Sequence, residues 1–238
     1  MLENINLKNI LFLDIETVPQ FSKYENLPES ISELWDRKFS TFRNEGVDET
    51  PASVYRRAGI YAEFGKIICI SVGAFSDANE FRIKSFFGHD EKKILNDFSD
   101  LIQKSYFSPD KLLCAHNGKE FDFPYLCRRF LINQLPLPSI LNIAGKKPWE
   151  VAHLDTMELW KFGDYKSYTT LVLLASVFGI QTPKDDIDGS NVWQVYWEEN
   201  NIERIVKYCQ KDVLTVAQIF KKFRCEDLIK PEHIIFPD

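Results

Sequence analysis

The chain has 238 residues, 45% hydrophobic and 27% charged, and its formal net charge is −6 at pH 7. This composition supplies a sizeable core and excludes global disorder, while the acidic balance means that any contact with a polyanion has to be local. No signal peptide and no membrane span are expected, because no apolar run has the required length. The five cysteines form no C-x-x-C pair and lie mostly in apolar surroundings, which favours reduced core residues of a cytoplasmic protein.

The first predicted strand covers residues 9–16, within "LFLDIETVP", and carries two acids. Apolar residues on both faces indicate a central strand that is covered on both sides. Asp14 and Glu16 share one face near the carboxyl end of this strand, where open α/β sheets place their functional sites. Both acids can stay ionised if divalent metals bind there, and such an oxygen-rich site suits Mg²⁺ or Mn²⁺. An equally open alternative is that the strand ends at Leu13 and that both acids are solvated.

A partly helical insertion is predicted for residues 20–58, which are charged and contain the amphipathic stretch "ISELWDRKFSTF". Such an insertion is a candidate flap or lid, although surface decoration explains it equally well. Trp35, Phe39 and Phe42 have helical spacing, so packing explains them better than stacking on nucleic-acid bases does.

Strands and helices then alternate along the chain. A hairpin is expected from strands at 65–75 and 80–87, joined through Asp77, Ala78 and Asn79. The further elements expected are a helix at 90–105, a strand at 111–117, a helix at 123–134, a strand at 153–155, and helices at 168–178, 190–199 and 201–223. Ser190 is the expected N-cap of its helix. No repeat or linker interrupts the chain, so we expect a single α/β domain over residues 1–238, with helices on both faces of a mixed sheet.

A third acid, Asp122, lies in "HNGKEFDFPYL", after the strand at 111–117 and at the start of a helix. The helix N-terminus alone would explain an acid there. Asp155, in "DTMEL", is predicted to cap a helix rather than to serve the site. His116 and His153 are expected to be structural, since four carboxylates are available as metal ligands.

A fourth acid lies in "YCQKD", in the last long helix. Tyr208 and Asp212 are one helical turn apart and share a face. Asp212 borders the predicted buried stripe, which consists of Ile205, Cys209, Val213, Val216 and Phe220. A solvated acid beside an aromatic residue would account for this position when it is considered alone.

Together these motifs resemble the tyrosine-bearing (DEDDy) branch of the DEDD superfamily of 3′→5′ exonucleases. The sequence is similar to the proofreading exonuclease domain of family B DNA polymerases and to stand-alone bacterial relatives of that domain. The three motifs are "LDIET", "HNGKEFDFPYL" and "YCQKDV", and "HLDTMELWKF", "TTLVLLASVFGI" and "KDDIDGSNVWQVY" lie between the last two. Each motif alone is weak, but their order and spacing over about residues 9–222 make the set specific.

The resemblance implies an RNase H-like fold, for which we expect a mixed five-stranded sheet, and hydrolysis of nucleotides from the 3′ end of single-stranded nucleic acid, DNA rather than RNA. It also implies two bound divalent metals, Mg²⁺ or Mn²⁺. The ligands expected for them are Asp14, Glu16, Asp122 and Asp212, whose charges balance two divalent ions. Tyr208 is assigned to orienting the attacking water and relaying its proton, since a phenol with an ordinary pKa near ~10 is a poor base.

Three further residues enter by the family match only. Asn117 and Phe121 are expected to touch the terminal nucleotide, and Thr17 is expected to present its backbone N–H to the 3′ end.

Two other functions compete with this assignment. One is an RNA-directed or structure-specific nuclease on the same fold, and the other is a non-catalytic module that holds a 3′ end. The presence of all four acids together with the tyrosine favours catalysis. A polymerase domain does not fit in 238 residues, so the protein is expected to act alone or as a partner's subunit, with a protein partner in replication or repair left open.

Overall fold

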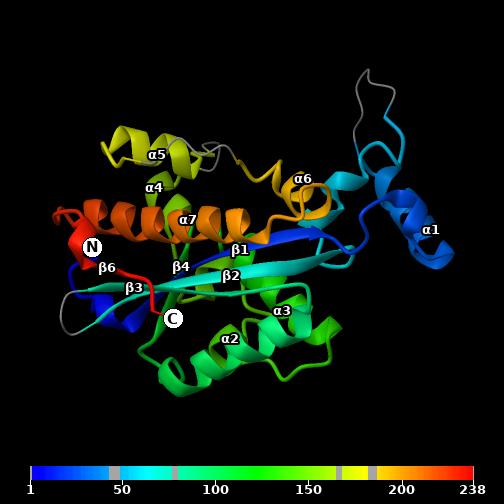
Figure 1. Cartoon of the computed structure of the whole chain (residues 1–238). Coiled ribbons are helices and arrows are strands. Elements are labelled where there is room, and N and C mark those ends of the chain that lie inside the picture. Colours follow the sequence, from blue (N-terminus) through cyan, green and yellow to red (C-terminus); the bar gives the residue numbers. More distant parts are fainter. Residues whose placement is uncertain (1, 43–48, 77–79, 165–167, 182–186, 238) are drawn as a thin grey trace.

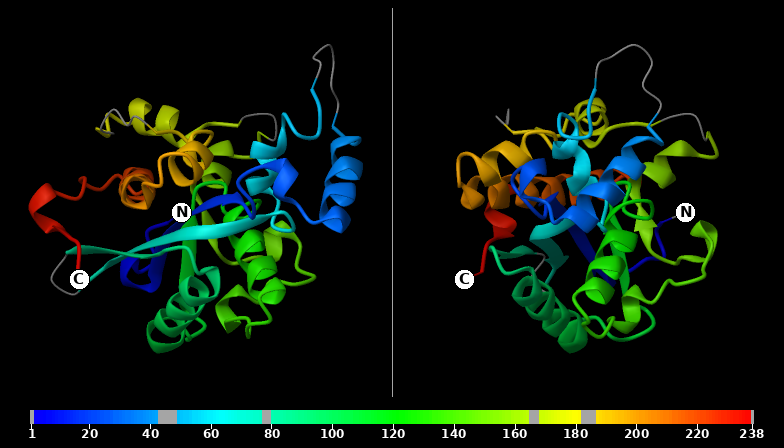
Figure 2. Two further views of the ribbon diagram at one scale, coloured as in Figure 1. Left: turned by 45° about the vertical axis from the view of Figure 1, so that its right-hand side comes forward. Right: turned by 90° about the vertical axis from the view of Figure 1, so that its right-hand side faces the viewer.

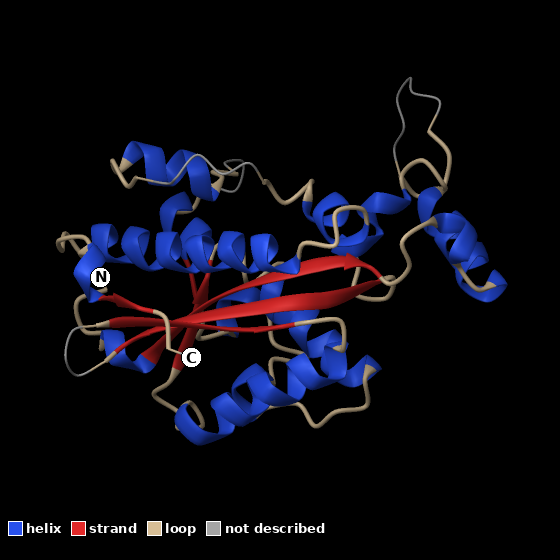
Figure 3. Cartoon of the chain, viewed as in Figure 1, coloured by secondary structure: helices blue, strands red, loops and turns tan. Residues whose placement is uncertain are grey.

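The computed structural model describes residues 2–42, 49–76, 80–164, 168–181 and 187–237. Its centre is a six-stranded mixed sheet, in the order β5-β4-β1-β2-β3-β6, with helices on both faces (Figures 1 and 3). The predicted mixed α/β sheet is confirmed, but the predicted number of five strands is wrong. The sixth strand, β6 (Ile234–Ile235), pairs in parallel with β3 and has only two residues, too few to show any periodicity in the sequence.

Two types of pairing meet at the central strand, β1 (Ile10–Pro19). On one side lies the predicted hairpin of β2 (Gly65–Phe75) and β3 (Phe81–Phe87), with β2 antiparallel to β1. On the other side lie β4 (Leu112–Ala115) and β5 (Leu154–Asp155), both parallel to β1. Residues 77–79, expected to join the hairpin strands, lie outside the described residues.

The helices also lie close to their expected positions. They are α1 (Glu29–Phe39), α2 (Glu91–Ser105), α3 (Asp122–Ile132), α4 (Thr156–Lys161), α5 (Leu171–Val177), α6 (Val192–Trp197) and α7 (Ile202–Phe223). One cap differs from the prediction, because Asn191 and not Ser190 precedes α6. Ser190 instead donates hydrogen bonds to the Asp188 carboxylate, which closes a turn one residue earlier.

Strand β1 is buried on both faces, as its sequence predicts. Leu11 and Leu13 belong to the core between the sheet and helices α2 and α3. Phe12 points to the opposite face, where Val213 and Phe220 of α7 cover it. Figure 1 shows these two layers, with α7 above the sheet and α2 and α3 below it. The acids on β1 that share a face with Phe12 therefore point toward α7.

The insertion after β1 has a small aromatic core of its own. Helix α1 lies beyond the ends of β1 and β2, and the 3₁₀ helix η3 (Tyr55–Ile60) lies between α1 and α6 (Figures 1 and 2). Trp35 is fully buried and donates from Nε1 to the carbonyl of Pro51 at 2.8 Å, with Phe39 and Phe42 packed around it. These aromatic residues therefore pack against one another, as their spacing predicts.

Both histidines considered as ligands have structural roles. The ring nitrogens of His116 bond to the Thr156 hydroxyl and to the Thr169 carbonyl, each at 2.9 Å. Both ring nitrogens of His153 are likewise hydrogen-bonded to backbone groups.

The cysteines are unpaired, as expected, but they are not all in the core. Cys69, Cys114 and Cys209 are buried and Cys127 is partly buried, whereas Cys225 is exposed just after the end of α7. Within the described ranges, no helix has both the length and the apolar character that crossing a membrane requires.

Candidate active site

The carboxyl-terminal half of β1 carries the first two acids. Asp14 lies opposite Ser71 of β2 and Glu16 lies opposite Cys69, so both side chains leave the same face of the strand. The register of the β1–β2 pair shifts between Glu16 and Thr17. A bulge at this point re-aims the next side chain, as bulges beside functional sites commonly do. Glu16 is only 7% exposed, which excludes the alternative of a solvated acid at this position.

The third acid, Asp122, begins α3 beside the same strand. It is 4% exposed, and its carboxylate accepts a hydrogen bond from the backbone of Ile15, the residue between the two β1 acids. The turn before α3 starts at Asn117, whose φ of 62° is a left-handed conformation that asparagine tolerates. This contact therefore brings Asp122 to Asp14 and Glu16 from a distant part of the sequence.

Asp155 holds this turn in place from β5. Its carboxylate accepts from the backbone N–H groups of Met157 and Glu158, which confirms the predicted cap of α4. It also accepts from the N–H groups of Asn117 and Lys119, both at 3.0 Å. One buried side chain thus fixes the start of α4 and the turn that leads to Asp122.

Helix α7 supplies the fourth acid and the tyrosine. The predicted stripe Ile205, Cys209, Val213, Val216 and Phe220 is buried against the sheet. Tyr208 and Asp212 lie at the edge of this stripe, both partly exposed, and their side chains are hydrogen-bonded to each other. Burial, followed by the charges of Asp212, Glu16 and Asp14, raises the pKa of Tyr208 above its ordinary value.

The four acids, here called the acid cluster (Asp14, Glu16, Asp122 and Asp212), repel one another. Burial raises the pKa of Asp14 and of Glu16 well above the ordinary value, and the other carboxylates of the cluster raise both further. Burial likewise raises the pKa of Asp122 to about 7. Like charges this close are relieved either by protonation of a carboxyl group or by cations that bind between the carboxylates.

The cluster has features of a cation site. Asp14 Oδ2 is buried without a hydrogen-bond partner. In the described part of the chain, Asp14, Glu16 and Asp122 form no ion pair with a basic side chain. Ligand atoms of Asp14, Glu16 and Cys209 lie within 4.8 Å of one another. The residues present therefore fit divalent cations, which would pair with the unpaired carboxylates.

Cys209 beside these acids is a contact that the sequence analysis missed, since it placed this residue in the buried stripe only. Its Sγ donates to the carbonyl of Asp14 at 3.4 Å, and burial raises the pKa of the thiol well above its ordinary value. A neutral thiol that already donates to the backbone is a poor ligand for Mg²⁺ or Mn²⁺, which prefer oxygen. The chemistry of the site therefore rests on carboxylates.

A cavity of about 480 Å³, here called the acidic cavity, opens over the cluster. The expected site residues in its wall are Asp14, Glu16, Thr17, Phe121, Tyr208 and Asp212. Asp122 is buried beneath the wall, and Asn117 lies at the turn before α3 and does not line the cavity.

Helix η3, the turn before α6 and α6 itself supply wall residues that were not expected from the sequence, namely Arg56, Arg57, Gly59, Ile60, Gly189, Ser190 and Trp193. The available signals were the consecutive arginines in an acidic chain and the segment "KDDIDGSNVWQVY", which contains Gly189, Ser190 and Trp193. Tyr125 of α3 anchors η3 here by donating to the carbonyl of Gly59 at 2.7 Å. A Cβ on Gly59 would approach the Val18 backbone to 3.1 Å, so glycine allows η3 to lie close to β1.

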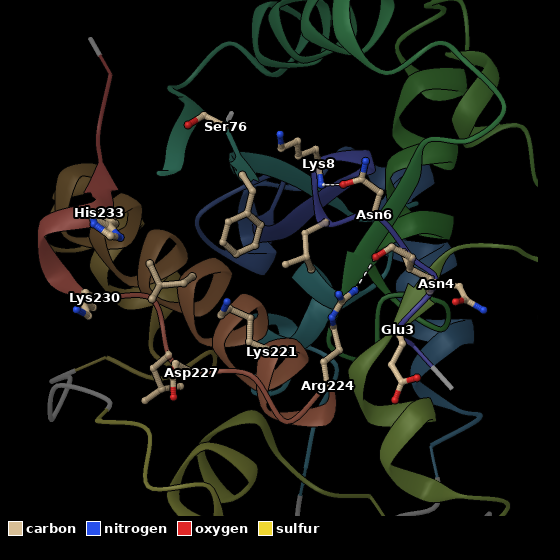
Figure 4. A pocket seen from close by; sticks show the side chains of 15 residues that line it. Glu3, Asn4, Asn6, Lys8, Ser76, Lys221, Arg224, Asp227, Lys230 and His233 are labelled. Carbon is tan, nitrogen blue, oxygen red and sulfur yellow. Dashed lines mark hydrogen bonds between the residues drawn. The ribbon is translucent and has the colours of Figure 1, made fainter. Parts of the chain in front are cut away.

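A second, larger cavity of about 720 Å³, here called the basic cavity, lies at the other end of α7 (Figure 4). It is lined by Lys221 and Arg224, about 20 Å along the helix from Tyr208. Arg224 donates to the carbonyls of Leu2 and Ile5 and pairs with Glu226, which also binds Lys221 at 3.2 Å. Lys221 and Arg224 are therefore already engaged within the protein.

Comparison with known proteins agrees with this geometry. The family model described as "Predicted 3'-5' exonuclease related to the exonuclease domain of PolB" matches residues 60–229. The structure is similar to that of the family B DNA polymerase from the hyperthermophilic archaeon Pyrobaculum calidifontis, with a TM-score of 0.54 and 15% sequence identity over 91% of this chain. This likeness confirms the RNase H-like fold, although the chain spans only 24% of the polymerase. The chain belongs to the family of predicted 3′–5′ exonucleases related to the exonuclease domain of PolB.

Proposed function

We propose that this protein is a metal-dependent 3′→5′ exonuclease of the DEDDy type, acting on single-stranded nucleic acid and on DNA in preference to RNA. The observation that carries the proposal is the acid cluster at an open cavity, with three of its acids in the cavity wall and one carboxylate oxygen without a hydrogen-bond partner. Family membership supports the direction of attack. The chain acts as one domain, to which the insertion at 20–58 contributes part of the cavity wall.

The acid cluster would hold two divalent cations, Mg²⁺ or Mn²⁺. Asp14 and Glu16 supply ligands from β1, Asp122 from the start of α3, and Asp212 from α7. Bound there, two such ions would supply Lewis-acid stabilisation of the scissile phosphate and would acidify water. The protein's own part is to hold four carboxylates from three elements close together at a cost in electrostatic repulsion.

Tyr208 orients the attacking water. Its raised pKa keeps the phenol protonated at neutral pH, so the hydroxyl serves as a hydrogen-bond donor and not as the initial base. The hydrogen bond to Asp212 fixes the ring at the cavity wall. Any proton relay through this hydroxyl has to be concerted, since a free phenolate is disfavoured among the carboxylates.

Thr17 and Phe121 are proposed to bind the terminal nucleotide. Thr17 follows the bulge in β1 and lines the cavity, so its backbone N–H is a candidate partner for the 3′ end. Phe121 lines the same cavity from the start of α3 and offers an aromatic face to the base. Asn117 is proposed to act from the turn before α3, by supporting Phe121, whose N–H donates to the Asn117 carbonyl at 3.0 Å.

The test is a product ladder from 5′-labelled single-stranded DNA, single-stranded RNA and duplex DNA of one sequence, with Mg²⁺ or Mn²⁺. We expect stepwise shortening from the 3′ end, fastest on single-stranded DNA and abolished by EDTA. A strand with a blocked 3′ end serves as the control. Degradation of that strand, or of a circular strand, at the rate of the free linear strand would contradict exonuclease action.

A further inference from the structure

Two arginines line the acidic cavity without neutralising its acids. Arg56 and Arg57 belong to η3, whereas the acids in the wall belong to β1 and α7. Among the described residues, neither arginine forms an ion pair with the acid cluster, and Arg57 pairs only with Glu49, at 3.7 Å. The wall therefore carries separate negative and positive parts, which is the arrangement that suits a ligand held partly through cations and partly by arginine.

Arg56 is positioned without the use of its hydrogen-bond donors. Its guanidinium carbon lies 4.4 Å from the centroid of the Trp193 ring on α6. None of its N–H groups donates to another described residue, so these donors stay available for a ligand while the contact with Trp193 restrains the side chain. A donor fork held in this way loses little freedom when it binds a phosphate, which favours binding.

Arg57 offers a second positive charge next to the first. Its side chain is exposed, and its pair with Glu49 is long, so this ion pair contributes little stability and exchanges readily for a phosphate. The elements that carry the two arginines and Trp193 lie at the end of the sheet where α1 stands (Figure 2). A strand leaving the acid cluster in this direction would meet an aromatic residue and two cations, the combination that binds single-stranded nucleic acid.

We propose that Arg56, assisted by Arg57, binds the phosphates that precede the terminal nucleotide of a single strand; this inference rests on the proposed exonuclease function. The scissile phosphate belongs to the acid cluster and its cations. Neither arginine reaches ion-pair distance of that cluster, so their partners are the next phosphates along the strand. The two arginines therefore act in substrate binding and favour substrates that have phosphates preceding the scissile one.

The test compares two substrates that differ in preceding phosphates. One is a single-stranded DNA oligonucleotide, and the other is the p-nitrophenyl ester of thymidine 5′-phosphate, which has one phosphodiester and no preceding phosphate. We expect Arg56→Ala to raise KM for the oligonucleotide about tenfold with little change in kcat. The ratio of kcat/KM for the oligonucleotide to that for the ester should fall by a similar factor. Arg56→Lys, which keeps the charge but not the planar fork, should give an intermediate ratio.

The matched control is Arg37→Ala, which removes the same charge from an exposed position on α1 outside the cavity. It should leave the ratio of the two substrates unchanged. An equal loss on both substrates in Arg56→Ala would overturn the proposal, because the arginine would then act at the scissile phosphate or on the fold. An unchanged ratio in Arg56→Ala would also overturn it.

A binding measurement separates this proposal from the proposed function. Fluorescence anisotropy of a labelled single-stranded oligonucleotide, in Ca²⁺ without turnover, reports affinity against salt concentration. Losing one phosphate contact should reduce the slope of log K against log salt by about 0.7 in Arg56→Ala and not in Arg37→Ala. A wild-type protein that hydrolyses neither substrate refutes the exonuclease assignment, whereas an unchanged slope in Arg56→Ala refutes the phosphate contact alone.

Discussion

The two cavities along α7 differ in whether their charged side chains have partners within the protein. At the basic cavity, Arg224 and Lys221 each pair with Glu226, and Arg224 also donates to backbone carbonyls of the N-terminal segment. Partial burial alone would raise the pKa of Glu226, yet the hydrogen bonds from Arg224 and Lys221 lower it below its ordinary value. These two basic residues therefore stabilise the ionised form of Glu226 in the folded chain.

In the acidic cavity the pKa values of the carboxylates shift in the opposite direction. Burial and neighbouring carboxylates raise the pKa of Asp14, Glu16 and Asp122, and one carboxylate oxygen has no partner. Such an arrangement destabilises the metal-free chain and is retained where a ligand requires it. Unpaired carboxylates therefore identify the acidic cavity as the functional site, although the basic cavity is the larger of the two.

The largest effect is expected from removing a single acid of the cluster. Asp14→Ala, Asp122→Ala or Asp212→Ala should lower the rate of hydrolysis by roughly 10⁴-fold or more, because each removes a proposed metal ligand. Glu226→Ala, which removes a carboxylate from the basic end of α7, should leave the rate unchanged. Single-turnover rates, with circular dichroism to confirm folding, test this contrast. Near-normal turnover in any folded variant of the cluster would remove the acid cluster from the mechanism.

A smaller loss of activity is expected for Tyr208→Phe. The hydroxyl orients water but is not proposed as a ligand, so its removal should slow the chemical step by about 10²–10⁴-fold. Metal affinity, measured by titration, should stay close to that of the wild type. Tyr168→Phe is the matched control, since its exposed hydroxyl bonds to Glu120 at 3.0 Å outside the cavity. An unchanged rate in Tyr208→Phe would make this residue a packing aromatic, and a loss of metal binding would make it part of the metal site.

The sequence predicts the elements that carry the acids because their patterns are local. The alternation in β1 and the stripe of α7 place Asp14 and Asp212 on definite faces, and both faces point as expected. What brings the acids together is less local. The bond from the Ile15 backbone to Asp122, and the bonds from the Asn117 and Lys119 backbone to Asp155, join parts of the chain that only the folded sheet makes neighbours.

The path of the insertion was not predictable from its sequence. Its amphipathic helix and aromatic spacing indicate packing, and Trp35 is indeed buried. Periodicity does not reveal, however, that η3 returns to β1 and places Arg56 in the cavity wall. That position depends on tertiary contacts, among them the bond from Tyr125 to the carbonyl of Gly59 and the stacking of Arg56 on Trp193.

A substitution in the basic cavity should change the stability of the protein and leave its rate of hydrolysis unchanged. Arg224→Ala removes the hydrogen bonds to Leu2, Ile5 and Glu226, which should lower the free energy of unfolding by about 1–3 kcal/mol. Because the pKa of Glu226 is lowered by its partners, this stabilisation is present above the ordinary pKa of the carboxyl group and is lost as the pH falls through the lowered value. Urea denaturation of both proteins against pH measures this. A variant with normal stability but slow hydrolysis would reverse the roles of the two cavities.

The smallest expected effect is a change in thermal stability, and the sign of this change is what tests the comparison. Without metal, Asp14→Asn should stabilise the protein by about 1 kcal/mol, a rise in Tm of roughly 2–4 °C, because it removes one of several neighbouring like charges, that of the carboxylate whose Oδ2 has no partner. With saturating Mn²⁺ the order should reverse, since the wild type gains the free energy of metal binding and the variant gains less. Asp97→Asn is the control, an exposed carboxylate paired with Lys93 on α2, and should change Tm little and equally in both conditions. Thermal unfolding in EDTA and in Mn²⁺ gives both comparisons. Destabilisation of Asp14→Asn in EDTA would mean that the carboxylate already has a stabilising partner within the protein, and the contrast between the two ends of α7 would then fail.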